Sequence, residues 1–167
     1  MNGFTEITAY ELGNSAKLIG KDWMLITVKD GSSANAMTAS WGCMGVLWNK
    51  PVAVCFIRPQ RYTFELAENE ERMSLAFFGD GYRDALSICG SKSGRDCDKL
   101  ALAGLTSFEI DGVPVINEAN TVIICKKLYA DDLKDEKFVD SSLLEHYKSS
   151  DFHRMYVLEI QKVLVKE

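Results

Sequence analysis

Basic residues gather in two short stretches of an otherwise acidic chain. One stretch follows the apolar run "PVAVCFI", and the other is the glycine-containing sequence "CGSKSGRDCDK". The basic side chains in them are Arg58, Arg61, Lys92, Arg95 and Lys99. Arginine makes planar two-point contacts with phosphate, lysine supplies a point charge, and glycine-rich turns expose backbone N–H groups. If the fold brings the two stretches together, they form a pocket for an anion; the alternative is ordinary surface charge.

The glycine-containing stretch is not a P-loop. A P-loop has four residues between its glycines and places Lys-Ser or Lys-Thr directly after the second one. Here three residues separate Gly90 from Gly94, and Lys92 and Ser93 lie between these glycines. A phosphate bound at this stretch therefore belongs to a ligand that is held in another way.

A second unusual segment, "NAMTASWG", runs from Asn35 to Gly42. Small and hydroxyl-bearing residues precede Trp41, so the backbone of this segment can lie against a flat ring and offer hydrogen bonds to heteroatoms at the ring's edge. The same pattern is equally typical of a strand edge followed by a core tryptophan. From the residues alone, both interpretations stay open.

The composition is that of an ordinary globular protein, and we expect one domain. The 167 residues are 47% hydrophobic and 26% charged, and a chain of this length can bury a sizeable core. The net charge of −5 argues against nucleic acid as the main partner, because phosphate backbones attract basic proteins. We find no signal peptide and no apolar run of about 18 residues, so we expect no membrane partner.

Cysteine and acidic residues give no sign of a metal site. The five cysteines include no C-x-x-C pair, which argues against zinc ribbons and thioredoxin-like redox motifs. Free thiols are typical of a reducing compartment, so we expect a cytoplasmic protein whose cysteines are mostly small core residues. The acidic run 131–140 lacks the glycine and the terminal glutamate of a calcium loop, which predicts a solvated loop. His146 is predicted to lie on the surface of a helix.

Apolar runs and turn residues predict more strands than helices. We expect strands at 23–28, 51–57, 72–79, 106–110, 113–116, 120–130 and 153–166, with a hairpin turn at Asp111-Gly112. We expect short helices at 62–71, 82–89, 98–104 and 141–149, with Thr63 and Asp98 as N-caps and Gly90 and Gly104 as ends. The stretch 30–40 resembles a loop. Because helices and strands do not alternate one for one, we predict a mainly β fold, an antiparallel β-barrel with short connecting helices.

Three stretches resemble one known family. They are "NAMTASWGCMGVLWNKPVAVCFIRPQRYTFE", "GSKSGRDCDKLALAGL" and "DFHRMYVLEI", and together they cover most of the chain from Asn35 to Ile160. The first two are similar to the signature and the second loop of the flavin reductase-like family, the FMN-binding split barrels. The third is similar to the closing motif of that family, and the overall pattern is most similar to its flavoredoxin-like branch.

The resemblance implies a split-barrel homodimer with FMN bound near the subunit interface, and the phosphate of the basic stretches would then belong to FMN. It implies that the isoalloxazine and ribityl groups are lined by Asn35, Met37, Thr38, Ala39, Ser40 and Trp41. It implies a second binding loop of Arg58, Arg61, Tyr62 and Thr63, with further contacts from Cys89, Gly90, Ser91, Lys92, Ser93 and Lys99. Which loop takes the phosphate and which takes the ring stays open.

His153 is the candidate catalytic residue, because it stands where the family's closing motif has its histidine. An ordinary histidine pKa near neutrality would let it orient an electron donor or manage a proton. The alternative is a histidine that ties the start of a strand to a neighbouring loop. The motif's Gly-Asp is replaced by Asp151 and Phe152, and its later glycine by Leu158. These departures put direct NAD(P)H use in doubt more than flavin binding, and Phe152 is a candidate to cover one face of the ring.

The sequence therefore predicts an FMN-binding flavoprotein oxidoreductase. It either reduces flavin with NADH or NADPH as a transient donor, or passes electrons through bound FMN to a redox partner protein. The alternatives are a non-catalytic flavin-binding or electron-carrier module and a pyridoxamine-phosphate oxidase-like protein, whose substrate-binding pattern we do not find.

Overall fold

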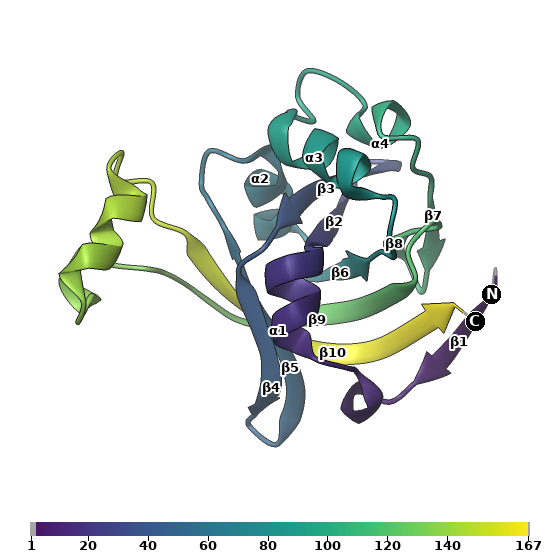
Figure 1. The fold of residues 1–167 in the computed structure, drawn as a ribbon, viewed down its shortest axis with the longest axis horizontal. Coiled ribbons are helices and arrows are strands. Elements are labelled where there is room, and N and C mark those ends of the chain that lie inside the picture. The colour runs from purple at the N-terminus through teal and green to yellow at the C-terminus, as the bar shows by residue number, and fades with distance from the viewer. Residues whose placement is uncertain (1–2, 167) are drawn as a thin grey trace.

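The computed structural model describes residues 3–166 and consists mainly of antiparallel strands joined by short helices (Figure 1). This confirms the mainly β fold. The strands are β1 (Phe4–Ile7), β2 (Met24–Asp30), β3 (Ser33–Ala39), β4 (Gly42–Leu47), β5 (Lys50–Ile57), β6 (Arg72–Phe77), β7 (Ser107–Ile110), β8 (Val113–Ile116), β9 (Thr121–Asp132) and β10 (Arg154–Lys166). The α-helices are α1 (Ser15–Lys17), α2 (Tyr62–Asn69), α3 (Arg83–Ser91) and α4 (Lys99–Leu102). The 3-10 segments are η1 (Ala9–Glu11), η3 (Asp135–Lys137) and η4 (Ser141–Tyr147), and η2 (Leu18–Asp22) is a π-helical segment.

One eight-stranded sheet forms the body of the protein. Its order is β3-β2-β6-β9-β10-β5-β4, and β1 also pairs with β10. The strands at the two ends of this order, β3 and β4, are separated in the chain only by Ser40 and Trp41. The sheet therefore curves back on itself, and the short Ser40-Trp41 connection lies where its ends approach each other.

Strand β2 is apolar on both faces because each face packs against a different core cluster. Alternate residues of a strand point to opposite faces of the sheet. Met24 and Ile26 lie in one core cluster, which also contains Ile57 from β5. Leu25 between them lies in the other cluster with Leu86 of α3. Both faces of β2 are thus covered, one by the barrel interior and one by helices.

The β7–β8 hairpin confirms the predicted turn. Asp111 and Gly112 both have positive φ, 52° and 76°. Two consecutive residues with positive φ are required by the hairpin turn whose twist matches that of the strands, and Asp-Gly is a preferred pair for it. The long strands expected near 120–130 and 153–166 are also confirmed as β9 and β10.

The loop expected at 30–40 is wrong, because most of it is strand β3. All seven residues of β3 pair with β2, from Ser33 opposite Asp30 to Ala39 opposite Met24. Serine, alanine and asparagine have little intrinsic preference for strands, so the local sequence gave no strand signal. Pairing with the apolar neighbour β2 decides the conformation.

Two expected helix boundaries are also wrong. Arg61, not Thr63, takes the N-cap position of α2, and the side chain of Thr63 is buried with 1% exposure. Gly90 does not end α3, which continues to Ser91. A Cβ atom on Gly90 would lie 3.4 Å from Cβ of Thr38, so this glycine serves close packing of α3 on β3.

Residues between β9 and β10 form an arm that projects from the barrel (Figure 1, green-yellow at the left). The arm comprises residues 133–153 and carries η3 and η4. The helix expected at 141–149 is thus a 3-10 segment, and His146 on it is exposed as predicted. The acidic run 131–140 begins inside β9 rather than in a loop.

None of the helices within residues 3–166 has the length and hydrophobicity needed to cross a bilayer. The same residues contain no group of three or more His, Cys, Asp or Glu side chains arranged to hold a metal ion. Cys55, Cys89 and Cys125 are buried, as expected of core cysteines, whereas Cys43 is exposed.

Candidate functional site

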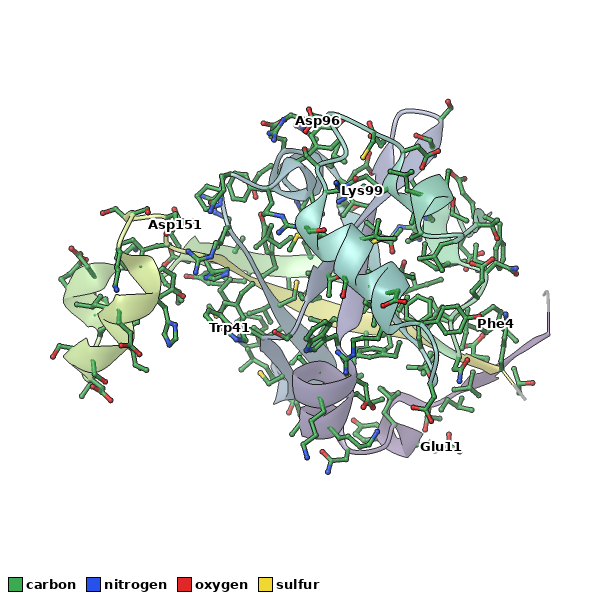
Figure 2. All side chains as sticks on the ribbon, turned by 45° about the horizontal axis from the view of Figure 1, so that its top comes forward. Phe4, Glu11, Trp41, Asp96, Lys99 and Asp151 are labelled. Carbon is green, nitrogen blue, oxygen red and sulfur yellow. The ribbon has the colours of Figure 1, made fainter. Side chains whose placement is uncertain are left out.

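A cavity of about 210 Å³ opens where the end of β3 meets β5. Its lining residues come from three separate parts of the sequence and are Met37, Thr38, Ala39, Ser40, Trp41, Phe56, Arg58, Arg61 and His153. The sheet curvature brings the Ser40-Trp41 connection beside the end of β5 and the start of β10. Trp41 and Asp151 flank the place where the arm meets the barrel (Figure 2).

Two cations converge on one backbone carbonyl at the end of α3. Arg61 Nη2 and Lys99 Nζ each lie 3.4 Å from the carbonyl oxygen of Cys89. Lys99 is 4% exposed, and burial and the charge of Arg61 lower its pKa. Burial likewise lowers the pKa of Arg61. Within residues 3–166, neither side chain has a carboxylate within ion-pair distance, so this positive charge is not balanced by the chain.

Lys99 also lines a second cavity of about 240 Å³. The other lining residues are Asp30, Ser33, Ala34, Asn35, Gly94, Cys97, Asp98 and Leu100. Arg61 thus borders the first cavity and Lys99 the second, and the carbonyl of Cys89 lies between the two cations. The two basic stretches therefore lie close together at Arg61 and Lys99, which favours the first of the two interpretations that the sequence left open.

Gly94 is required where its loop crosses β3. A Cβ atom at this position would lie 2.2 Å from Oδ1 of Asn35 and 2.9 Å from Cδ1 of Tyr62. Asn35 in turn donates to Oγ1 of Thr63 at 2.8 Å. Asn35 and Thr63 therefore join β3, α2 and the 92–97 loop, and Thr63 lines neither cavity.

The charge of Arg58 is paired with a carboxylate, unlike the charges of Arg61 and Lys99. Its guanidinium forms an ion pair with Asp151 and donates to the carbonyl oxygen of His146 at 3.0 Å. Gln60 donates to the same carboxylate at 2.7 Å, and these two donors hold the pKa of Asp151 below its usual value. Arg58 thus lines the cavity and fastens the arm to the end of β5.

His153 is buried and uncharged at neutral pH. Its ring lies 5.0 Å from the Trp41 ring, and its Nδ1 lies 2.9 Å from the hydroxyl oxygen of Tyr147. Burial, with the nearby charge of Arg58, lowers the pKa of His153 to about 4. The expectation of a pKa near neutrality is therefore wrong, and His153 offers a neutral hydrogen-bonding ring rather than a titrating group.

The remaining predicted residues lie outside the first cavity. Phe152, expected to cover a bound ring, instead stacks on Tyr147 of the arm with 4.8 Å between ring centroids. Ser91 donates to the carbonyl oxygen of Ser87 in its own helix, and Lys92 is exposed. Ser93 accepts from the backbone N–H of Arg95. Tyr62 donates to Oδ1 of Asp30 at 3.0 Å.

Two residues of the site were missed from the sequence. Phe56 could have been found from the alternation of β5, because it is half-buried between the buried residues Cys55 and Ile57. Tyr147 gave no such signal, since its contact with His153 depends on how the arm folds back.

The family described as "Flavin reductase like domain" matches residues 17–167. The structure is similar to an FMN-binding protein from Thermus thermophilus (24% identity, TM-score 0.66, covering 87% of this chain and 71% of the other). It is also similar to an FMN-binding domain of a flavin reductases-like enzyme from Shewanella baltica (16% identity, TM-score 0.72, covering 98% of this chain and 77% of the other). A third similar structure is flavoredoxin from Methanosarcina acetivorans (22% identity, TM-score 0.68, covering 87% of this chain and 69% of the other). At these identities the solved structures establish the fold alone, and no curated protein matches.

Proposed function

Because the chain belongs to the flavin reductase-like family, we propose that it is a flavoprotein oxidoreductase whose cofactor is FMN. The observation that carries this proposal is the unbalanced positive charge of Arg61 and Lys99. A buried cation without an anionic partner is costly, and proteins retain such groups mainly where a ligand supplies the missing charge.

The phosphate of FMN fits this charge better than any other part of the molecule. The oxidised flavin ring is neutral, whereas a phosphate monoester carries a charge of about −1.5 to −2 at neutral pH. Arg61 and Lys99 would share that charge, arginine through two donors and lysine as a point charge. We therefore assign the phosphate to these two side chains, with Gly94 allowing the loop to approach β3 closely.

The ring of FMN would lie along the end of β3. Thr38, Ala39, Ser40 and Trp41 line the first cavity, and Phe56 and His153 add further flat rings to its lining. Thr38 is a rigid part of this wall, since its hydroxyl donates to the carbonyl oxygen of Leu86 at 2.5 Å. Ring cofactors are usually held by flat or apolar side chains together with a few fixed polar groups, and the lining of this cavity contains both kinds.

Bound FMN supplies two-electron redox chemistry, and the chain supplies binding and electrostatics. Reduction places negative charge on the ring, which nearby positive charge stabilises. Arg58 lines the ring cavity while it is paired with Asp151, so it contributes a fixed and partly screened charge. We propose NADH or NADPH as electron donor. The donor would enter the cavity beside Trp41, a lining residue whose side chain is 43% exposed.

We propose that the protein acts as a homodimer. The cavity of about 210 Å³ is smaller than the roughly 300–1,000 Å³ of typical ligand sites, so a second subunit would enclose more of the cofactor. The end of β4 and the turn after it expose Val46, Leu47 and Trp48 by 61%, 41% and 56%. An apolar patch on an edge strand favours association with another chain. Sedimentation equilibrium should give a dimer, and Trp48→Glu should give a monomer with weaker FMN binding; a monomeric wild type would contradict this.

The proposed function is tested with the purified protein, loaded with FMN and freed of excess cofactor, under anaerobic conditions. Retention of the visible flavin spectrum supports the cofactor assignment. Bleaching on addition of NADH or NADPH supports a reductase. An unchanged flavin spectrum after both additions would favour an electron carrier that receives electrons from a partner protein. Failure to bind FMN at all would overturn the proposal.

A further inference from the structure

The arm contributes a buried hydroxyl to the site. Tyr147 is 7% exposed and His153 8%, and their polar atoms lie 2.9 Å apart, hydroxyl oxygen to Nδ1. The Tyr147 ring stacks on Phe152 at an interplanar angle of 19°, and the guanidinium carbon of Arg58 lies 5.2 Å from its centroid. The hydroxyl is thus held in place by the packing of the arm.

Only one direction of this hydrogen bond gives the tyrosine O–H an acceptor, and that is donation from Tyr147 to Nδ1 of His153. Within residues 3–166, the hydroxyl of Tyr147 has no other acceptor, and a buried O–H without an acceptor is costly. Donation by Tyr147 requires Nδ1 of His153 to be unprotonated, which places the ring proton on Nε2. A positively charged imidazole is disfavoured first by burial and then by the nearby charge of Arg58.

The Nε2 atom of His153 is free to serve a ligand. It has no hydrogen-bond partner in the described part of the chain, and His153 lines the first cavity beside Trp41 and Phe56. A fixed Nε2–H group in this position can donate to a carbonyl oxygen. A second proton would go to Nδ1, which would reverse the bond to Tyr147 and leave the tyrosine O–H without an acceptor.

We propose that Tyr147 is a positioning residue that fixes His153 as a neutral Nε2–H donor toward a carbonyl oxygen of the ring bound in the cavity. The ligand in this inference rests on the proposed function. The family comparison does not assign any role to the arm, and the inference makes residues 133–153 part of the site. His153 then orients a ring and does not transfer a proton.

The test is ¹⁵N NMR of the full chain labelled at histidine. The chain has two histidines, and the exposed His146 is assigned with a His146→Gln variant. We expect His153 to show a single Nε2–H tautomer between pH 5.5 and 8, without titration. Tyr147→Phe should give a mixture of tautomers and a higher pKa. Tyr156→Phe is the matched control, since this buried tyrosine donates to Glu68 instead, and it should leave His153 unchanged.

An Nδ1–H tautomer or a titration near pH 6.5 in the wild type would overturn the inference, even if Tyr147→Phe fails to fold. Addition of FMN should shift the Nε2 resonance if the acceptor is the flavin ring. A shift only after addition of a nicotinamide nucleotide to the loaded protein would assign the carbonyl of the carboxamide instead. No shift with either would overturn the ligand role. Loss of FMN binding with the expected tautomer would refute the proposed function while leaving the Tyr147–His153 pairing intact.

Discussion

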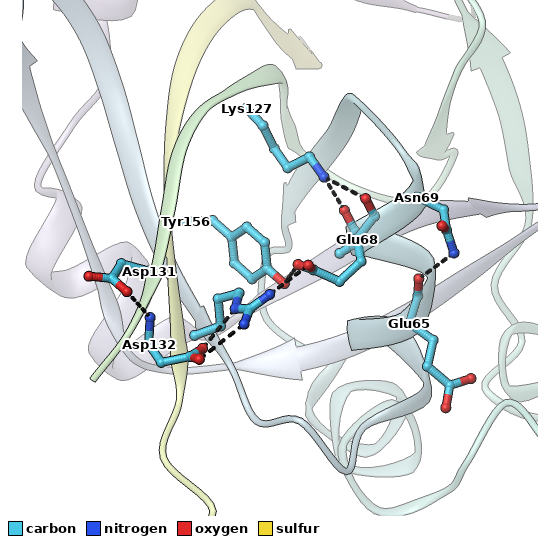
Figure 3. A network of polar contacts seen from close by, with 9 residues as sticks. Glu65, Glu68, Asn69, Lys127, Asp131, Asp132 and Tyr156 are labelled. Atoms are coloured by element: carbon cyan, nitrogen blue, oxygen red, sulfur yellow. Dashed lines mark hydrogen bonds and ion pairs between the residues drawn. The ribbon is translucent and has the colours of Figure 1, made fainter. Parts of the chain in front are cut away.

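Two groups of cationic side chains in this protein differ in how their charge is balanced. Arg154 contacts Asp132 at 2.7 Å and Glu68 at 2.6 Å. Tyr156 donates to the same Glu68, and Figure 3 labels Glu68, Asp132 and Tyr156 in this network. At the end of α3, Arg61 and Lys99 share one carbonyl oxygen and have no carboxylate. The first group completes its charges within the chain and joins α2 to β9 and β10. Within residues 3–166, the second group has no carboxylate at ion-pair distance.

The carbonyls at the ends of two helices sharpen this comparison. At the end of α2, a single lysine, Lys127, donates to the carbonyl oxygens of Ala67 and Glu68. One cation is the usual complement of a helix C-terminus. At the end of α3 two cations compete for one carbonyl, and burial, followed by the charge of Arg61, lowers the pKa of Lys99. Helix capping accounts for one of them and not for both.

The largest expected effect is on FMN affinity. Replacing Lys99 by methionine should weaken FMN binding on the order of 100-fold, because a charge-assisted hydrogen bond contributes roughly 1.5–3 kcal/mol. Stability should fall by less than about 0.5 kcal/mol, because the change removes a buried charge that lacks a partner. Fluorescence titration and urea denaturation measure the two quantities. Lys127→Met is the matched control: it should lower stability and leave FMN affinity within about twofold.

Removing the cation of the Arg154 network should lower the free energy of unfolding and leave FMN affinity unchanged. Arg154→Met leaves Glu68 and Asp132 without their cation and removes the contact of the guanidinium with Phe64. The Arg154 side chain is 26% exposed, so solvent screening reduces the loss to about 2–3 kcal/mol of unfolding free energy. Urea denaturation should detect this loss while FMN affinity stays unchanged. A large drop in FMN affinity with normal stability would erase the distinction between the two groups.

His153 differs from both groups of cations because it is uncharged in the folded protein at neutral pH. Its pKa of about 4 in the folded protein lies below the ordinary value of about 6.5, so the unfolded chain binds a proton first as the pH falls. Its contribution to stability is therefore lost on acidification, by about 2 kcal/mol between pH 7 and pH 5. A His153→Gln variant should lack this part of the pH dependence. Identical slopes of stability against pH in both proteins would show that His153 titrates normally.

The sequence predicted the elements whose signals are local. Strands β5, β9 and β10 and the Asp111-Gly112 turn follow from apolar runs and turn chemistry, and all are found. The sequence also indicated that the two basic stretches form an anion pocket if the fold brings them together, and Arg61 and Lys99 do lie close together. It did not predict β3, whose small residues become a strand only through pairing with β2.

The details of the site required the folded structure. Arg58 forms an ion pair with Asp151, which is far away in the chain. Lys99 forms no ion pair with any carboxylate within residues 3–166. Neither fact can be read from the neighbouring sequence. The burial of His153 and its contact with Tyr147 likewise depend on the path of the arm. Residue types indicated which groups could bind an anion, and only the fold distinguishes the balanced charges from the unbalanced ones.

We propose that Arg61 and Lys99 bind the phosphate of FMN. Calorimetric titration of the wild type and of Lys99→Met with FMN and with riboflavin, which lacks the phosphate, tests it most directly. We predict that the wild type prefers FMN on the order of 100-fold and that Lys99→Met loses most of this preference by binding FMN more weakly while riboflavin affinity is unchanged. An equal preference for FMN in both proteins would contradict the account.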